Sequence, residues 1–244
     1  MRQDALWAGG PVFYFDETAF PPTMDTFLLG DFSRGKRGER VCDLGAGTGL
    51  LGLLLLAREP SLHVTGVELN PAAVPLAEET IRANGLSDRM TLLTADLRQL
   101  DGVLPAGAFD RVVCNPPYFQ AGSGAAPSSG DRRLAREDAA ATIDEVSHAA
   151  GRLLRFGGRL EVVFRPERLC DLLCALRTAA VEPKRLRFVQ QRADTPPLLL
   201  LLEGRRGGRP GLSVEAPLLL ENLDGTPSSA LDAIYFRDRE DAAL

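Results

Sequence analysis

Short apolar runs alternate along the chain with longer segments in which apolar residues recur at helical spacing. The short runs predict β-strands, and the longer segments predict the helices that connect them. Expected strands cover residues 40–44, 62–67, 90–94, 111–114, 159–164, 186–190 and 198–202. Expected helices cover residues 50–58, 71–83, 139–154 and 166–178.

Strands that alternate with helices predict an α/β fold with a mostly parallel sheet and helices on both of its faces. No helix is expected between the last two of the seven strands, so we expect them to form a terminal antiparallel hairpin in a seven-stranded sheet. In such folds ligands bind beyond the carboxyl ends of the strands. Residues that directly follow the predicted strands are therefore the first candidates for a functional site.

Length and composition are those of a soluble globular protein. The 244 residues suffice for one large domain, with 45% hydrophobic and 25% charged residues. No apolar run approaches the roughly 20 residues that a membrane-spanning helix needs. The first residues lack the apolar segment of a signal peptide. We therefore expect a cytoplasmic protein without a membrane partner.

Charge is unevenly distributed. Residues 1–120 hold 10 Lys and Arg against 15 Asp and Glu, whereas residues 121–210 hold 16 against 11. The basic part of the chain is either an ordinary solvated surface or a binding surface for a polyanion. Both interpretations remain open at this point.

The cysteines do not indicate a metal site. Cys42, Cys114, Cys170 and Cys174 form no CxxC pair, and the chain has only two histidines. Cys42 and Cys114 end predicted strands, where a free cysteine packs as a small apolar residue. Cys170 and Cys174 lie four residues apart on one predicted helix and are expected to be free thiols.

A glycine-rich loop follows the first predicted strand, in the sequence Asp43-Leu44-Gly45-Ala46-Gly47-Thr48-Gly49. Glycines let the backbone turn tightly and approach a ligand, and the next helix offers free N–H groups at its start. The segment 47–52 also matches the GxGxxG pattern of dinucleotide-binding proteins, with Glu68 placed to bind a ribose. A nicotinamide-dependent dehydrogenase is thus an alternative, although no histidine is placed for hydride transfer.

Acidic residues end three successive predicted strands. Asp43, Glu68 and Asp96 could accept hydrogen bonds from an ammonium group, a ribose and an exocyclic amine. With the glycine loop, this arrangement resembles the class I S-adenosylmethionine-dependent methyltransferases, which implies their Rossmann-like fold. The resemblance implies that the glycine loop runs alongside the methionine part of S-adenosylmethionine, that Glu68 binds its ribose and that Asp96 lies beside its adenine amine. The cofactor-binding residues expected in this way are Asp43, Gly45, Ala46, Gly47, Gly49, Glu68, Leu69, Asp96, Leu97 and Asn115.

A rigid corner, Cys114-Asn115-Pro116-Pro117-Tyr118-Phe119, follows the fourth predicted strand. Proline fixes the backbone and has no N–H group, so the corner offers acceptors without competing donors. The side-chain carbonyl of Asn115 and the main-chain carbonyl of Pro116 suit a ligand amine with two N–H groups. Tyr118 could stack on the ring that carries this amine. We expect Asn115, Pro116 and Tyr118 to act in catalysis, and Pro117 and Phe119 to contact substrate.

The corner resembles the Asn/Asp-Pro-Pro-Tyr signature of amino-methyltransferases, which modify adenine N6, cytosine N4, guanine N2 or glutamine N5. Phe119, the segment 23–30 (TMDTFLLG) and the segment 135–137 (ARE) extend this resemblance to the bacterial tRNA(Val) adenine N6-methyltransferase family. The family implies S-adenosylmethionine as cofactor, S-adenosylhomocysteine as product, no metal, and tRNA as partner. Its target is the adenine beside the anticodon, and Asp25 is then expected to contact substrate.

The expected organisation has three parts. Residues 1–38 form an N-terminal lid or substrate segment, 39–205 the methyltransferase core, and 206–244 a tail that packs on the core. Within the core, residues 120–137 are rich in Gly, Ser, Ala and Pro and predict a mobile loop. The basic end of this loop is expected to bind substrate through Arg132, Arg133 and Arg136.

Other functions share the same motifs. A release-factor glutamine methyltransferase usually carries a helical substrate domain before the glycine loop, and only 42 residues precede Asp43. A guanine N2 or DNA adenine methyltransferase is a second alternative. A non-catalytic module that binds cofactor or RNA is a third, against which the intact corner at Asn115 argues. The oligomeric state, monomer or dimer, remains open.

Overall fold

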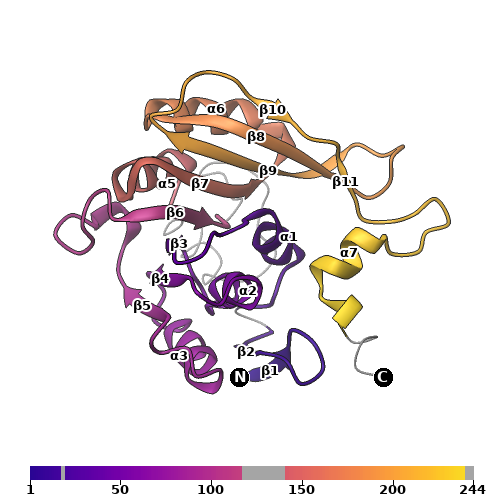
Figure 1. Cartoon of the computed structure of the whole chain (residues 1–244), viewed down its shortest axis with the longest axis horizontal. Coiled ribbons are helices and arrows are strands. Elements are labelled where there is room, and N and C mark those ends of the chain that lie inside the picture. The colour runs from indigo at the N-terminus through magenta and orange to yellow at the C-terminus, as the bar shows by residue number, and fades with distance from the viewer. Residues whose placement is uncertain (18–19, 117–140, 240–244) are drawn as a thin grey trace, which may run out of the picture.

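The computed structural model describes residues 1–17, 20–116 and 141–239. Its centre is a twisted, mostly parallel sheet in the strand order β10-β8-β9-β7-β6-β3-β4-β5, with β11 also paired to β8 (Figure 1). The seven main strands are β3 (Arg40–Leu44), β4 (His63–Glu68), β5 (Met90–Thr94), β6 (Phe109–Cys114), β7 (Leu154–Phe164), β8 (Val181–Gln190) and β9 (Pro197–Arg206). The predicted α/β fold and its seven strands are confirmed.

The predicted terminal hairpin is part of the central sheet. β9 lies between β7 and β8 and is antiparallel to both, whereas β3 to β7 pair in parallel with one another. Two strands of two residues each, β10 (Ser213–Val214) and β11 (Leu218–Leu219), pair with the outer edge of β8. These short edge strands were not predicted, because two residues carry no readable periodicity.

Helices cover both faces of the sheet. On one face lie α1 (Met24–Phe32), α2 (Leu50–Arg58), α3 (Val74–Ala83) and α7 (Ser229–Ile234); on the other lie α5 (Ile143–Leu153) and α6 (Leu169–Thr178) (Figure 1). The predicted helix starts at 71 and 166 are too early, because a turn precedes α3 and a 3₁₀ helix, Pro166–Arg168, precedes α6. α5 starts after Thr142, whose side chain and that of Glu145 form a capping box.

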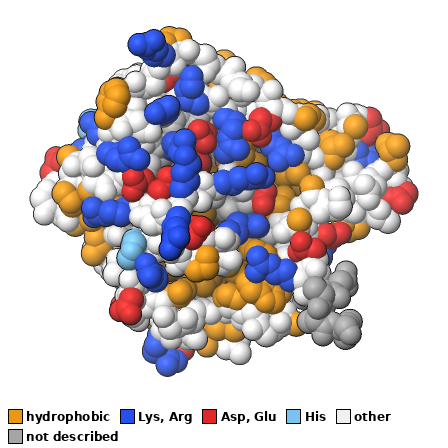
Figure 2. All heavy atoms as spheres, in the orientation of Figure 1, with side chains coloured by type: hydrophobic (Ala, Val, Ile, Leu, Met, Phe, Trp, Pro, Cys, Tyr) orange, Lys and Arg blue, Asp and Glu red, His pale blue; other side chains and the backbone are white. Residues whose placement is uncertain are grey.

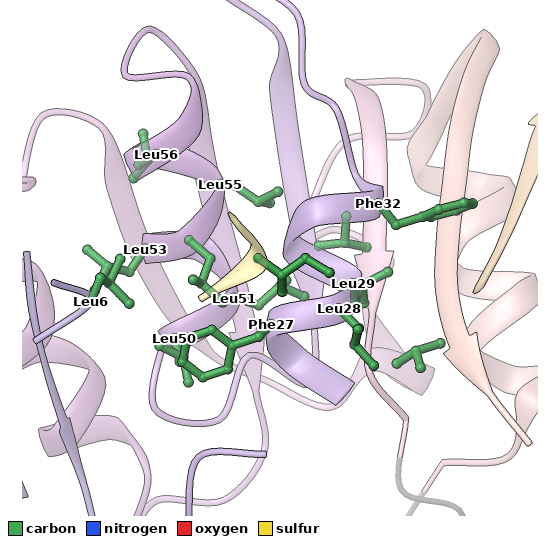
Figure 3. Packing of buried hydrophobic residues seen from close by; sticks show 14 of the residues in the cluster. Leu6, Phe27, Leu28, Leu29, Phe32, Leu50, Leu51, Leu53, Leu55 and Leu56 are labelled. Atoms are coloured by element: carbon green, nitrogen blue, oxygen red, sulfur yellow. The ribbon is translucent and has the colours of Figure 1, made fainter. Parts of the chain in front are cut away.

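The N-terminal region contains elements that the sequence patterns did not predict. β1 (Arg2–Ala5) and β2 (Val12–Phe15) form an antiparallel hairpin, and α1 follows it. α1 packs on the sheet beside α2 and buries five of its nine residues, so its sequence lacks a clear polar face (Figure 3). The fold thereby places the N-terminal segment beside the glycine loop.

Two apolar clusters lie on opposite sides of the sheet. Neighbouring β6 residues alternate between them, since Val113 belongs to the cluster of α1 and α2 and Val112 to that of α5 and α6. The C-terminal segment joins the first cluster. Phe236 packs on Trp7 with ring centroids 5.1 Å apart, and Tyr235 stacks on Phe27 at 4.5 Å.

Basic side chains gather on the face drawn in Figure 2, over β6 to β9, and acidic side chains lie among them. Arg185 is 3.4 Å from both Glu203 and Glu215, and Arg159 is 3.4 Å from Glu203. The positive charge of this part of the chain is therefore partly neutralised. Within the described residues no helix is long and apolar enough to cross a membrane.

Candidate functional site

The carboxyl ends of β3, β4, β5 and β6 meet at one edge of the sheet and surround two neighbouring pockets. Residues of all four strand ends line the first pocket, among them Gly45, Glu68, Leu69, Asp96, Leu97, Asn115 and Pro116. The second pocket lies between the glycine loop and the segment 20–26 and is lined by Asp43, Ala46, Gly47, Thr26 and Asn115, among others. Gly45 and Asn115 line both pockets and mark where they meet.

The glycine loop leaves space for a ligand. Gly45 and Gly47 have φ angles of +76° and +53°, and a Cβ atom at either position would meet no heavy atom within 4 Å. The N–H groups of Gly45 and Ala46 donate to the carbonyl of Val67 at 2.9 and 3.0 Å. β4 thus holds the loop in a left-handed turn that favours glycine, with its open side toward the pockets.

Glu68 connects the end of β4 to the glycine loop. Its Oε2 accepts from the N–H of Gly47 at 2.8 Å, and its Oε1 accepts from the N–H of Asn70 at 2.6 Å. These two bonds fix the orientation of the carboxylate. Each carboxylate oxygen has a second lone pair, so Glu68 can still accept hydrogen bonds from a bound ribose.

Asp43 is a buried acid with an unsatisfied atom. Its relative exposure is 1%, and its Oδ2 has no hydrogen-bond partner among the described residues. Burial, and then the charge of Glu68, raise the pKa of Asp43 to about 8. A buried acceptor without a partner is unfavourable in the protein alone, so the second pocket suits a ligand with a positively charged donor.

Asp96 is held by a residue that the sequence analysis did not single out. Arg98 donates from Nε to both carboxylate oxygens at 2.9 and 3.0 Å and from Nη2 at 2.7 Å. The hydrogen bond from the Arg98 side chain lowers the pKa of Asp96. In the same pocket Leu69 keeps 44% of its surface exposed, which offers an apolar contact for a planar ring.

Asn115 follows β6 and is bound by α1. Its Nδ2 donates to Oγ1 of Thr26 at 3.0 Å, and the next residue, Pro116, is buried. No sequence pattern predicts a role for Thr26, because 89 residues separate it from Asn115. A threonine in the first turn of a helix gives no signal of such a contact.

The other predicted site residues have different outcomes. Gly49 and Asp25 do not line either pocket; Gly49 precedes α2, and Asp25 lies in the first turn of α1. Outside the described residues lie the loop 120–137 and the predicted site residues Pro117, Tyr118, Phe119, Arg132, Arg133 and Arg136.

Cys114 and Cys42 are buried free thiols, and Cys170 and Cys174 are exposed ones. Among the described residues no group of three or more His, Cys, Asp or Glu could hold a metal.

The two pockets fit S-adenosylmethionine by the chemistry of their linings. The turn at Gly45 and Gly47 gives room for an extended chain, and the unpartnered Oδ2 of Asp43 suits an ammonium group. Acceptors on Glu68 and Asp96 with the apolar Leu69 suit a nucleoside. The assignment of individual residues to the cofactor stays a prediction.

Comparison with known proteins identifies the family. The methyltransferase small domain matches residues 24–173. A curated tRNA1(Val) (adenine(37)-N6)-methyltransferase from Tolumonas auensis is 31% identical over 229 residues, covering 91% of this chain and 92% of that protein. The enzyme of the same name from Dickeya chrysanthemi is 31% identical over 240 residues and covers 94% of both chains.

Solved structures agree on the fold. A predicted O-methyltransferase from Agrobacterium tumefaciens superposes with a TM-score of 0.72 at 22% identity, over 87% of this chain and 96% of that one. A geranyl diphosphate C-methyltransferase from Streptomyces coelicolor, in complex with S-adenosyl-L-homocysteine, has a TM-score of 0.56 at 13% identity over 74% and 76% of the chains. The sequence matches to the methyltransferase small domain and to the two curated methyltransferases rule out the dehydrogenase alternative. The chain belongs to the methyltransferase small domain family and, within it, to the family of the tRNA1(Val) (adenine(37)-N6)-methyltransferases.

Proposed function

We propose that this protein transfers a methyl group from S-adenosylmethionine to the exocyclic N6 amine of an adenine in tRNA. The adenine beside the anticodon, position 37 in the names of the relatives, is the proposed target. The observation that carries the proposal is the position of Asn115, which lines both pockets, next to Pro116, which lines the first. A target amine there would be next to the proposed cofactor site.

The first pocket is the proposed site of the adenosine part of the cofactor. Glu68 would bind the ribose, and Asp96, oriented by Arg98, would lie beside the adenine amine. The second pocket would take the methionine part, with the ammonium group near Asp43. When bound, S-adenosylmethionine supplies a methyl group on a positively charged sulfur.

Asn115 and Pro116 would activate the target by position and electrostatics. An amine conjugated to a base is a poor nucleophile, because its lone pair is delocalised into the ring. Oδ1 of Asn115 and the carbonyl oxygen of Pro116 would each accept one N–H bond and direct the lone pair out of the ring plane. Since proline has no N–H group, Pro116 and Pro117 themselves offer no backbone donor to these oxygens. Tyr118 would stack on the base, which must first turn out of its own stack.

The remaining assignments follow from a tRNA substrate. We place the protein in the cytoplasm, where tRNA is modified, and assign RNA contacts to Arg132, Arg133, Arg136 and Pro117 to Phe119. Phe20 to Thr23 line the second pocket, which supports the proposal that residues 1–38 include a substrate segment. Arg58 of α2 lies over the ring of Phe236 at 4.4 Å and donates to the carbonyl of Ile234 at 3.0 Å, which supports the assignment of 206–244 as a tail on the core.

Mass spectrometry of nucleosides from methylated tRNA tests the function. The purified protein is incubated with S-adenosylmethionine and an unmodified tRNA1(Val) transcript, and we expect N6-methyladenosine that disappears when adenine 37 is replaced by guanine. Parallel reactions contain duplex DNA or a release factor. Methylation of DNA adenine, guanine N2 or a release-factor glutamine, without N6-methyladenosine in tRNA, would overturn the proposal.

Asn115→Ala tests the assigned chemistry in the same assay. We expect loss of methyl transfer with unchanged affinity for S-adenosylhomocysteine, because the proposed role of Asn115 is toward the target amine. Equal losses of binding and turnover would assign the residue to the cofactor instead.

A further inference from the structure

The link between Asn115 and Thr26 connects the proposed catalytic corner to the N-terminal helix. Nδ2 of Asn115 donates to Oγ1 of Thr26 at 3.0 Å, and both residues line the second pocket. A primary amide carries its oxygen and nitrogen on opposite sides of one carbon. If the neighbouring group accepts a hydrogen bond, Nδ2 faces that group and Oδ1 faces away from it. If the neighbouring group donates, Oδ1 faces it and Nδ2 faces away.

A hydroxyl group can donate or accept, so its own proton decides which way the amide lies. Oγ1 of Thr26 is 3.2 Å from Oγ1 of Thr23, the residue that caps α1. When Thr26 gives its single proton to Thr23, it can only accept from Asn115. The sequence of donors is then Asn115 to Thr26 to Thr23, and the amide lies with Nδ2 toward Thr26 and Oδ1 on the opposite side.

The N-terminal cap of α1 departs from the usual pattern. A capping threonine normally accepts from a backbone N–H two or three residues later, but Thr23 forms no such side-chain bond. Thr26 is the third residue of the helix, and its N–H donates instead to the main-chain carbonyl of Thr23 at 3.2 Å. The hydroxyl of Thr23 instead contacts the hydroxyl of Thr26, and this contact orients the side chain of Thr26.

α1 is also fixed to β6 at its other end. Nη2 of Arg111 donates to the carbonyl of Arg34 at 3.0 Å, and Ser33 donates to Glu161, which is paired with Arg111. From Thr26 to Ser33 a helix rises about 10 Å, and from Arg111 to Asn115 a strand extends about 13 Å. Contacts at both ends therefore hold Thr26 at a fixed position relative to Asn115.

We propose that Thr26 is a positioning residue that fixes the amide of Asn115 with Oδ1 toward the target amine. In the opposite orientation the NH₂ group of Asn115 would face the NH₂ group of the base, and neither could accept. The inference rests on the proposed function, because it assigns the direction in which Asn115 acts on the target amine.

Thr26→Val tests this role, because valine keeps the shape of threonine and lacks the hydroxyl. We expect at least a tenfold lower turnover at saturating tRNA, with affinity for S-adenosylhomocysteine unchanged within twofold. Thr26→Ser should restore most of the turnover. In an Asn115→Ala background, Thr26→Val should cause no further loss. Thr178→Val, at the exposed end of α6, is the matched control and should behave as the wild type.

A second measurement does not depend on activity. The side-chain NH₂ signals of Asn115 in ¹H–¹⁵N spectra are assigned by their loss in Asn115→Ala. We expect slow hydrogen exchange of one of these protons in the wild type and in Thr26→Ser, and fast exchange in Thr26→Val or Thr26→Ala. Fast exchange in the wild type, or wild-type turnover of Thr26→Val, would overturn the inference. Absence of tRNA methylation by the wild type would instead overturn the proposed function, and the exchange data would still decide the role of Thr26.

Discussion

The pKa of the buried Asp43 carboxyl group is raised to about 8, first by burial and then by the charge of Glu68 on the neighbouring strand. Asp43 is the last residue but one of β3 and Glu68 is the last of β4, and both lie in the region of the glycine loop. Two acids in such proximity are unfavourable when both are ionised. A bound ammonium group would relieve this repulsion and satisfy Oδ2 of Asp43, which links the stability of the site to its ligand.

Asp43 should make the ligand-free protein less stable as pH rises. Its folded-state pKa lies above the ordinary value of 3.8, so its contribution is fully present below about pH 4 and lost as pH rises through about 8. Relative to Asp43→Asn, the free energy of unfolding of the wild type should fall with pH by at most about 1.4 kcal/mol per unit. Urea unfolding of both proteins from pH 5 to pH 8 measures this difference. A difference that is constant across the range would contradict the raised pKa.

Glu68→Gln should weaken cofactor binding more than its small change in shape suggests. The amide keeps one acceptor oxygen but replaces the other with a donor, which opposes the N–H of Gly47 or of Asn70. Loss of one hydrogen bond to a charged group costs about 1.5–3 kcal/mol, so we expect roughly a 10- to 100-fold weaker affinity for S-adenosylhomocysteine by calorimetry. Glu78→Gln, at an exposed position of α3, is the control. Equal affinity of Glu68→Gln and the wild type for S-adenosylhomocysteine would mean that Glu68 does not bind the cofactor.

The sequence predicted the parts of the site that follow strands and left out those that come from far along the chain. Asp43, Glu68, Asp96 and Asn115 could be found because parallel strands end at one edge of a sheet. Thr26 could not, because its contact with Asn115 depends on how α1 packs, and α1 is apolar around most of its surface. The hydrophobic pattern identifies an amphipathic helix but not one that is enclosed on several sides.

Buried charges on the sheet escaped prediction for a related reason. Arg111 and Glu161 stand inside strands that read as core segments, and their relative exposures are 2% and 0%. Alternation places a residue on one face of the sheet, but it does not show which residue on the next strand lies opposite. The register of β6 and β7 places Arg111 opposite Arg159 and diagonal to Glu161, with which it forms the ion pair.

Arg111→Met should strongly destabilise the fold. The substitution leaves the carboxyl group of Glu161 buried without its guanidinium partner, and burial already raises the pKa of Glu161. Removal of one partner from a buried ion pair costs about 3–5 kcal/mol, whereas loss of an exposed pair costs less than about 1 kcal/mol. Urea unfolding measures the change, with Arg82→Met, which breaks the exposed pair with Glu79, as control. Arg111→Met combined with Glu161→Gln should recover part of the loss, and a double variant no more stable than the single one would argue against the pair.

Phe236→Ala tests whether the C-terminal segment stabilises the core. The ring is 1% exposed, packs on Trp7, and lies 4.4 Å from the guanidinium carbon of Arg58. Truncation of a buried phenylalanine costs about 3–5 kcal/mol. We expect a loss of this size in chemical unfolding, against about 0.5 kcal/mol or less for Leu223→Ala, whose side chain is 92% exposed. Similar effects of the two substitutions would mean that the segment after 206 contributes little to stability.

The basic residues Arg132, Arg133 and Arg136 should contribute to tRNA binding through phosphates. Each phosphate contact releases counterions, so the slope of log affinity against log salt concentration changes by about 0.7–0.9 per contact. Substitution of all three by Gln should reduce the slope by roughly 2–3 and weaken binding at low salt. The control replaces three exposed arginines elsewhere, Arg82, Arg177 and Arg209, and therefore removes the same charge from other surfaces. Both variants lose the same net charge, but only the first loses the proposed phosphate contacts. The salt dependence of tRNA affinity should therefore fall in the first variant and stay unchanged in the control. Equal slopes for the two variants would mean that Arg132, Arg133 and Arg136 belong to an ordinary solvated surface and do not contact tRNA phosphates.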